Sequence, residues 1–407
     1  MSSRLVVVGG GFAGLWSAAS AARARALFAI QEDELEIVLI APDQYHTIRV
    51  RCYEADLEPI RVPLDEVLTP INVRRIEGRV TRIDPEARAL AVEEAGGKAS
   101  NIDYERLVLA SGSNLVRPPI PLGRETFDVD SYQGGRRLAQ HLAALASAPR
   151  DDATRTAVVI GGGLVGIEIA CELPGRLRAA LGADAPVRVM LVDHGEIGGG
   201  MGNGRGVILD ALAALNVEAR PRTAVAAVDV AGVILASGER VPAATVIFAT
   251  GMRASPLTRT LGVTCDKLGR LSVNCFLEVA GLDAIYAAGD CASARADEHG
   301  HVTVMSCQHA RPMGRLAGHN ALCDLAGRPD DRVPFAAPDY VTVLDLGPAG
   351  ALYTAGWERG TVVAEGAEAK AAKQTINGTR IYPPRSASRD AILAAAAPAI
   401  QARPAVS

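Results

Sequence analysis

The chain has 407 residues, 49% of them hydrophobic and 22% charged, which is typical of a folded protein of two or three domains and excludes a disordered chain. Its 42 basic and 46 acidic residues give a net charge of -4, so no basic surplus exists to neutralise nucleic acid phosphates, and nucleic acid is not expected as a partner. The seven cysteines are widely spread and include no C-x-x-C pair. This pattern argues against a disulfide framework and a zinc site, and it predicts a reducing, cytoplasmic location.

The N-terminal segment predicts a strand, a glycine-rich turn, a helix and a second strand. Residues 5–8 are a β-branched run, a G-x-G-x-x-G turn opens at Gly9, and 15–29 have a helix-forming composition. A strand at 36–40 completes a βαβ unit. The uncharged stretch 5–22 is long enough for a signal peptide or a membrane span, but the glycines early in it argue against both.

The same order of elements recurs in the middle of the chain, with a second G-x-G-x-x-G turn that opens at Gly161. The interval from Gly14 to Ala41 is 27 positions, and the interval from Gly166 to Asp193 is the same. In such turns the first glycine permits a tight bend, the second lets the backbone approach a diphosphate and the third allows close packing of helix on strand. The repeat therefore predicts two dinucleotide-binding lobes.

Each βαβ unit is followed by turn-punctuated segments, 73–109 and 217–248, that predict a small antiparallel meander. Each then closes with an apolar strand that ends in a small polar residue and glycine, as in Ser111-Gly112 and in the Thr250-Gly251 pair. The predicted fold class is α/β, with two Rossmann-like dinucleotide-binding domains.

With these motifs the chain resembles, over about residues 4–325, the flavoproteins with two dinucleotide-binding domains, which are the pyridine nucleotide oxidoreductases. A strand that ends in Gly289-Asp290 matches the segment with which that superfamily returns to its first lobe. The resemblance implies that the first lobe binds FAD, that the second binds NADH as electron donor and that Asp290 bonds to the flavin side chain. The implied domains are FAD-binding (1–115 and 270–325), NAD(H)-binding (116–269) and a C-terminal interface domain (326–407).

Within the superfamily the chain is most similar to type II NADH:quinone oxidoreductases and to reductases like apoptosis-inducing factor. The similarity rests on 45–55, where an aromatic-His pair precedes a tyrosine, and on the Gly166-Ile167-Glu168 sequence. It implies that Glu168 reaches the contact between flavin and nicotinamide and tunes hydride transfer. The alternative is a carboxylate that only satisfies N–H groups at a helix N-terminus.

The residue at the end of the second strand of each βαβ unit affects which nucleotide is bound. An acidic group there binds ribose hydroxyls and repels a 2′-phosphate. Asp193 holds that place in the second lobe and favours NADH, because the nearest downstream arginine, Arg205, is distant in sequence. In the first lobe the place is held by Ala41, so either Asp43 binds the ribose or its hydroxyls face water or backbone. The full set of expected cofactor contacts is Gly9, Gly11, Phe12, Ala13, Gly14, Asp43, Ser111, Gly112, Gly161, Gly163, Gly166, Asp193, Gly251, Gly289, Asp290, Gln308, His309 and Ala310.

The cysteine pattern restricts the electron acceptor. Disulfide reductases of this superfamily use a C-x-x-x-x-C pair, but Cys52 has Leu57 at the partner position, which excludes that mechanism. A lone cysteine leaves peroxide or coenzyme A disulfide reduction open beside the interpretation of Cys52 as a buried structural residue. Sulfide oxidation needs a cysteine pair, and Cys307 has no convincing partner between Cys52 and Cys171.

Residues 306–314 resemble the Ala-Gln-x-Ala-x-Gln-Gln segment of quinone reductases, where a helix N-terminus faces the flavin ring. Gln308 and Ala310 match, and Gln308 is therefore the second catalytic candidate. The final two glutamines are replaced by Pro312 and Met313. His309 and Arg311 are candidates to orient a polar or anionic acceptor.

After about residue 325 the pattern changes. Prolines mark a linker, a hairpin is predicted over 340–346 and 351–353, and a helix over 367–376, which together form a small α+β domain. The alanine-rich tail 388–400 predicts a helix that packs on the protein or in a homodimer, because it lacks the large apolar and basic residues of a membrane anchor. No transmembrane segment is predicted, so the protein is expected to be soluble or at most peripheral to a membrane.

The function expected from these features is that of an FAD enzyme that takes hydride from NADH and passes electrons to a quinone-like or other small acceptor. Three alternatives stay open. The chain could reduce a soluble carrier protein such as a ferredoxin, it could use Cys52 to reduce peroxide or a disulfide, or it could be a redox-responsive NADH-binding protein with little turnover.

Overall fold

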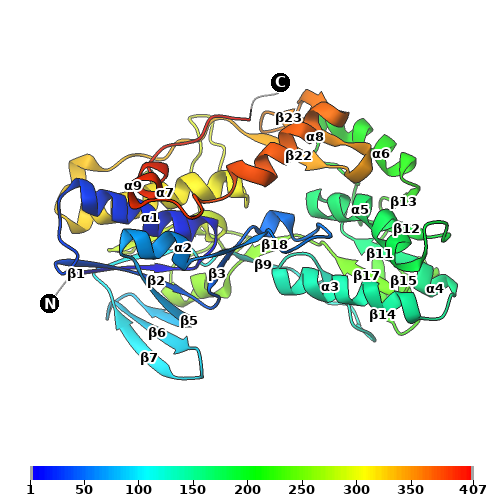
Figure 1. Cartoon of the computed structure of the whole chain (residues 1–407), viewed down its shortest axis with the longest axis horizontal. Coiled ribbons are helices and arrows are strands. Elements are labelled where there is room, and N and C mark those ends of the chain that lie inside the picture. The colour runs from blue at the N-terminus through cyan, green and yellow to red at the C-terminus, as the bar shows by residue number, and fades with distance from the viewer. Residues whose placement is uncertain (1–2, 405–407) are drawn as a thin grey trace.

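The computed structural model describes residues 3–404. Two lobes, each built around a parallel sheet, lie side by side, and a smaller C-terminal unit lies above the space between them (Figure 1). Among the helices of the described chain, none combines the length and the apolar character needed to cross a membrane.

The first lobe contains a seven-stranded sheet in the order β20-β8-β1-β2-β5-β6-β7. Its strands are β1 (Ser3–Val8), β2 (Leu35–Ala41), β5 (Arg74–Asp84), β6 (Ala89–Glu94), β7 (Ala99–Asp103), β8 (Arg106–Leu109) and β20 (Ile285–Ala287). The first part of β5 pairs in parallel with β2, and its remainder pairs antiparallel with β6. The late strand β20 pairs with β8, which brings the segment before Gly289 next to the first glycine turn.

Two parallel helices cover this sheet, α1 (Phe12–Leu27) and α7 (Cys307–Leu325). A Cβ atom added to Gly314 would lie 2.3 Å from the carbonyl oxygen of Ala13, and one added to Gly318 would lie 2.0 Å from that of Ser17. Only glycine permits this approach, and the Ser17 hydroxyl donates to the Gly314 carbonyl at 3.0 Å. The close parallel packing places the N-termini of both helices at the same edge of the sheet.

The second lobe contains a five-stranded parallel sheet in the order β10-β17-β11-β12-β13 and a three-stranded antiparallel sheet. Its strands are β10 (Phe127–Asp128), β11 (Thr156–Ile160), β12 (Arg188–Val192), β13 (Val217–Arg220), β14 (Val225–Asp229), β15 (Gly232–Leu235), β16 (Arg240–Pro242) and β17 (Thr245–Phe248). Its helices are α3 (Tyr132–Ala144), α4 (Asp152–Arg155), α5 (Leu164–Leu181) and α6 (Arg205–Ala214). The chain leaves the first lobe through β9 (Ser113–Leu115) and returns through β18 (Met252–Ala254), and these two strands pair.

In both lobes the antiparallel meander is shorter than the segment for which it was predicted. In 73–109 the last strand, β8, belongs to the parallel sheet and not to the meander. In 217–248 both ends, β13 and β17, extend the parallel sheet. In the sequence, a strand that is buried on both faces is a short apolar run. The residues around it do not distinguish it from a meander strand of the same length.

The C-terminal unit pairs β22 (Val341–Asp345) with β23 (Ala351–Ala355), as predicted, and adds an unpredicted third strand, β24 (Thr361–Glu365). Helix α8 (Gly366–Thr375) packs on this sheet and continues into a π-helical turn, Ile376–Arg380. The tail forms only a short helix, α9 (Arg389–Ala395), which packs on α1 of the same chain.

The remaining elements are short. They are α2 (Asp65–Leu68), β3 (Tyr45–Thr47), β4 (Arg61–Pro63), β19 (Leu271–Ser272) and β21 (Ala292–Ser293). The hairpin of β3 and β4 contains the aromatic-His pair of the sequence motif.

Candidate active site

The two glycine turns have nearly identical geometry. The first glycine of each, Gly9 or Gly161, has φ of +118°, and a Cβ atom there would lie 2.3 Å from a carbonyl oxygen of the strand beside it. A Cβ atom on the third glycine, Gly14 or Gly166, would lie 1.8 Å from the carbonyl oxygen of the first. Both positions exclude any other residue, because only glycine tolerates this φ and this approach without strain.

The middle glycine of each turn has a different environment. A Cβ atom on Gly11 or Gly163 would meet no atom within 4 Å. Each helix begins at the next residues, so its free N–H groups face this open space and can bind a diphosphate. Beside the first turn, the buried hydroxyl of Ser111 has no hydrogen-bond partner within residues 3–404, and Gly112 also faces open space. These features fit a dinucleotide at each turn.

Predicted flavin contacts from distant parts of the sequence meet beside the first turn. A Cβ atom on Gly289, whose φ is +77°, would lie 2.8 Å from the Cβ of Ala13 and 3.4 Å from that of Ala310. Asp290 accepts a hydrogen bond from the Ser113 hydroxyl at 2.6 Å. Phe12, the first residue of α1, packs edge-on against the ring of His46. The Gly289-Asp290 turn therefore lies against both helix N-termini.

The two predicted ribose-binding acids differ in their surroundings. Both Asp43 carboxylate oxygens accept hydrogen bonds from Arg61 at 2.8 Å, so Asp43 already has a strong partner and its contact with ribose stays a prediction. Asp193 accepts hydrogen bonds at 2.6 Å from the N–H groups of Gly162 and Gly195, which fixes its carboxylate beside the second turn.

Arg205 was the nearest downstream arginine that could clamp a 2′-phosphate. In the structure its guanidinium donates to Glu196 at 2.6 Å and to the Ile197 carbonyl oxygen at 3.0 Å. Arg205 is therefore already paired, and the acid at the end of β12 is Asp193.

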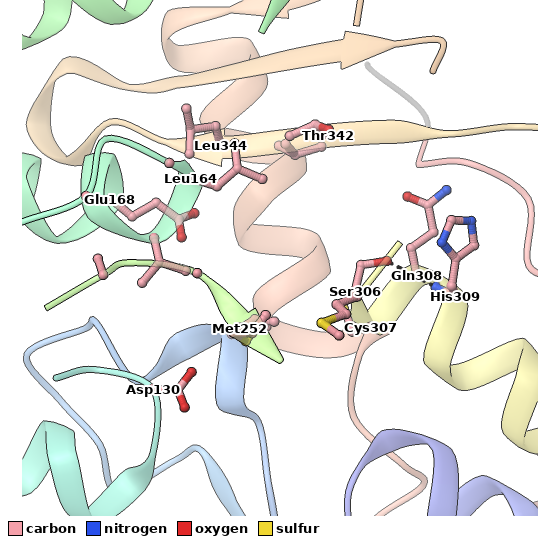
Figure 2. Close-up of a pocket in the computed structure, with 18 of the residues that line it drawn as sticks. Asp130, Leu164, Glu168, Met252, Ser306, Cys307, Gln308, His309, Thr342 and Leu344 are labelled. Carbon is pink, nitrogen blue, oxygen red and sulfur yellow. Dashed lines mark hydrogen bonds between the residues drawn. The ribbon is translucent and has the colours of Figure 1, made fainter. Parts of the chain in front are cut away.

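A cavity of about 900 Å³ connects the second glycine turn with the N-terminus of α7 and the C-terminal unit. Its lining includes Gly161, Gly163, Glu168, Asp193, Gly251, Gln308 and His309 of the predicted site. Figure 2 shows Glu168 and Leu344 on one side of this space and the first residues of α7 on the other. The first glycine turn does not line this cavity, so the structure groups the predicted residues into two adjoining regions.

Glu168 does not bond to N–H groups of its own helix. Its carboxylate accepts a hydrogen bond from Lys373 of α8 at 2.8 Å and from the Asp345 N–H at 3.2 Å. Both side chains of the Glu168–Lys373 ion pair are 9% exposed. Burial raises the pKa of Glu168, while the Lys373 ammonium opposes that effect. The pair therefore fastens the C-terminal unit to the second lobe at the wall of the cavity.

The first turn of α7 begins at Ser306, whose hydroxyl accepts from the His309 N–H at 3.4 Å. Gln308 Nε2 donates to the Asp339 carbonyl oxygen at 3.1 Å, which draws this side chain towards the C-terminal unit. The imidazole of His309 stacks on Tyr340 and Trp357 instead of turning to the glycine turn.

The buried imidazole of His309 is neutral, because desolvation lowers its pKa to about 4. Its Nδ1 lies 3.0 Å from the Val304 nitrogen and 3.3 Å from the Val304 carbonyl oxygen, so the Val304 backbone engages this nitrogen in either tautomer. The Nε2 atom is buried and has no partner within residues 3–404. His309 thus has one ring nitrogen left for a hydrogen bond to a ligand.

Cys52 lies in an apolar cluster with Ile48, Leu57, Ile60 and Ile381 and is fully buried. Burial raises the pKa of its thiol to about 12, so the nucleophilic thiolate is scarce at neutral pH. Cys307 packs on the edge of the same cluster, a proximity that the sequence did not reveal.

Other residues of the site gave no signal in the sequence. Lys373 is 205 residues from Glu168 and looked like one polar residue of a helix. Tyr340, Trp357 and Arg315 also belong to the site or its edge. Only Arg315 could have been found locally, because it lies four residues after Arg311 and so on the same face of a helix.

The fold and the two turns define a class of enzyme, the NAD(P)H-dependent flavin oxidoreductases. A family profile described as pyridine nucleotide-disulphide oxidoreductase matches residues 3–314. The chain belongs to this family, and its cofactors are FAD and NADH, which confirms the predicted fold class and cofactors.

Comparison with known proteins gives relatives of full length. The chain is 50% identical over 407 residues to an NADH dehydrogenase-like protein of Mycobacterium tuberculosis, with 99% of this chain and 100% of the relative covered. It is 26% identical over 366 residues to a demethylphylloquinone reductase of Synechocystis, with 86% of each covered. Its fold is similar to that of NDH2 from Plasmodium falciparum in complex with NADH, with a TM-score of 0.79, 12% identity and 97% of each chain covered.

Proposed function

We propose that this enzyme oxidises NADH and reduces a quinone-like acceptor. The observation that carries the proposal is the cavity of about 900 Å³, which reaches from the second glycine turn to the N-terminus of α7 and on to the C-terminal unit. Such a space has room for a nicotinamide at one end and a second substrate at the other. The names of the relatives, NADH dehydrogenase-like protein and demethylphylloquinone reductase, support the same acceptor class.

The flavin, when bound, supplies the two-electron chemistry that connects the two half-reactions. NADH loses a hydride and becomes NAD⁺, and the quinone gains the two electrons together with one proton from that hydride and one from solvent, and leaves as the quinol. The protein positions the reactants: Asp193 fixes the NADH ribose, the turn at Gly163 binds the diphosphate, and Glu168 reaches the contact between flavin and nicotinamide and tunes hydride transfer. The donor in this proposal is NADH and not NADPH.

At the acceptor end, Gln308 and His309 are proposed to orient the quinone. The Nε2 atom of His309 has no partner within residues 3–404, and in the tautomer that carries its proton there it is a donor for a carbonyl oxygen. Pro312 has no N–H, so the Gln308 carbonyl lacks its partner in the helix and remains available to a ligand or to water. Reduction through Cys52 is disfavoured, because this thiol is fully buried with a raised pKa.

The division into an FAD-binding domain (1–115 and 270–325), an NAD(H)-binding domain (116–269) and an interface domain (326–407) is part of the proposal. A homodimer contact through the C-terminal domain is proposed with it.

Anaerobic stopped-flow spectroscopy tests the function. The purified holoenzyme is reduced with NADH and then mixed in parallel with a short-chain quinone, hydrogen peroxide and an oxidised ferredoxin, while flavin absorbance is followed. Fast reoxidation by the quinone alone is expected. Fast reoxidation by peroxide would favour Cys52 chemistry, reoxidation by ferredoxin would favour a protein carrier, and a flavin that stays reduced with all three would favour a redox-responsive binding protein.

A further inference from the structure

Two buried arginines line the cavity without a counterion. Arg311 and Arg315, on the second and third turns of α7, are 7% and 5% exposed. Neither forms an ion pair within residues 3–404, and the Nε atom of each is buried without a hydrogen-bond partner. The single polar contact of Arg315 is a long one, 3.5 Å to the carbonyl oxygen of Ala399.

Unpaired buried guanidinium groups are costly, because a buried cation is normally paired or bound to a ligand. Burial lowers the pKa of Arg311, and it lowers the pKa of Arg315 to about 10, with a further contribution from the charge of Arg311. Two like charges are thus held close together in a poorly solvated place. An anion between them would remove both penalties.

A tryptophan holds both guanidinium groups in position. The Cζ atom of Arg315 lies 4.1 Å from the centroid of the Trp16 ring, and that of Arg311 lies 5.6 Å from it. The indole N–H of Trp16 is also buried without a partner. Two buried arginines with unused N–H donors therefore lie together at one aromatic ring, and an acceptor-rich ligand would satisfy these donors.

Within residues 3–404, the carboxylates that line the cavity are engaged elsewhere or out of reach. Asp130 pairs with Arg49 at 2.6 Å, Glu168 pairs with Lys373, and Asp193 accepts from two backbone N–H groups. The fourth, Asp339, is exposed and lies beyond ion-pair distance of both arginines.

The position of Arg315 separates this residue from the expected diphosphate of FAD. The diphosphate is expected at the N-terminus of α1, which begins at Phe12. Because Ala13 lies beside Gly314 and Ser17 beside Gly318, Arg315 is level with the second turn of α1, where Trp16 lies. By the same register Arg311 is level with Gly10 of the first glycine turn, so along the helix only Arg315 is separated from the diphosphate. Both arginines nevertheless line the cavity, which the first glycine turn does not.

We propose that Arg311 and Arg315 form an oxyanion subsite that selects a quinone-like acceptor carrying an acidic group, such as a carboxylate. This inference rests on the proposed function and narrows its substrate class. The planar guanidinium groups match two oxygens of one acidic group, and Trp16 keeps them in place before the acceptor arrives.

The test compares naphthoquinone with naphthoquinone sulfonate, which share a reducible ring and differ by one oxyanion. In steady-state assays with NADH, kcat/KM for the sulfonate is expected to fall about tenfold relative to naphthoquinone in Arg311→Gln and in Arg315→Gln. Arg311→Lys is expected to restore part of the loss, because it keeps the charge and loses the planar fork. An unchanged ratio in both glutamine variants would overturn the subsite.

The matched control is Arg328→Gln. Arg328 lies over the ring of Phe28 at 4.3 Å, much as Arg315 lies over Trp16, but it pairs with Asp331 and does not line the cavity. The control should leave the ratio between the two quinones at its wild-type value. A loss equal to that of Arg315→Gln would mean that overall charge and not a subsite attracts the sulfonate.

Equilibrium dialysis of naphthoquinone sulfonate against oxidised holoenzyme separates this inference from the proposed function. If neither quinone reoxidises the wild-type flavin, the proposed function fails, and the dialysis still decides whether the arginines bind an oxyanion. The FAD content of each variant is measured as well. Loss of FAD from Arg311→Gln and Arg315→Gln would assign the arginines to the flavin phosphates and overturn the acceptor subsite.

Discussion

The ion pair between Glu168 and Lys373 predicts a pH-dependent loss of stability when one partner is removed. Lys373→Met leaves the Glu168 carboxylate buried, with the Asp345 N–H at 3.2 Å as its remaining partner. Breaking a buried pair costs about 3–5 kcal/mol. Because one hydrogen bond survives, we expect a loss near the lower end, about 3 kcal/mol at pH 8.

The sign of the pH dependence follows from the pKa of Glu168, which burial raises in the folded protein. A carboxyl group whose pKa is higher in the folded than in the unfolded protein makes its full contribution to stability at low pH, where it is protonated in both states. That contribution is lost as the pH rises through the pKa of the folded state. Without the Lys373 ammonium this pKa rises further. The stability of Lys373→Met should therefore decline relative to wild type as the pH rises above the ordinary pKa of a glutamate.

The assay is urea denaturation followed by the fluorescence of Trp357, in a Trp16→Phe background that leaves one reporter in the C-terminal unit. The control is the double variant Glu168→Gln with Lys373→Met, which removes both charges. The stability of the double variant should not decline with pH as that of Lys373→Met does. If Lys373→Met matched the double variant at every pH, Glu168 would not be a buried charge and the reasoning would be wrong.

Three further outcomes are expected. Asp193→Ser combined with His194→Arg should shift the kcat/KM ratio towards NADPH by about tenfold or more, and a wild-type enzyme that already prefers NADPH would contradict the role of Asp193. Cys52→Ser should leave quinone turnover unchanged in stopped-flow assays, whereas an inactive variant would restore the single-cysteine mechanism. Gly166→Ala should abolish NADH binding, measured by quenching of NADH fluorescence, because its Cβ would lie 1.8 Å from a carbonyl oxygen. Gly175→Ala in the same helix meets no atom within 4 Å and should gain up to about 1 kcal/mol in stability. Equal NADH affinity in the two alanine variants would refute this account of the turn.

The parts of the fold that were predictable are those fixed by neighbouring residues. Each glycine turn is required by close contacts between a strand, the bend after it and the next helix. For the first turn, the spacing of glycines from Gly9 to Gly14 was therefore enough to predict it. The tail shows the limit of such reasoning. Its alanines favoured a helix over 388–400, but the helix ends at Ala395, because Pro398 disfavours helical backbone at the residue before it.

The parts that were not predictable depend on contacts between distant segments. Nothing around Lys373 indicates that its ammonium is buried, because its partner Glu168 lies in another lobe. In the same way His309 matched a variable position of the motif, and only the structure shows that Tyr340 and Trp357 draw its ring towards the C-terminal unit. Such side chains acquire their roles when the C-terminal unit docks on the two lobes.

Helix α7 shows how one element can keep its contacts to a cofactor while its contacts to a substrate change. Its first turn keeps Gln308 and Ala310, and the latter packs beside Gly289 where the flavin is expected. Its next turns differ from the quinone reductase motif at Pro312 and Met313. Met313 is fully buried, so this change repacks the core and leaves the cavity to its neighbours on the helix. On these turns Arg311, Pro312 and Arg315 line the cavity, and a long neutral quinone tail gains nothing from two unpaired cations. Under the proposed subsite, the helix keeps the same flavin chemistry and takes an acidic acceptor.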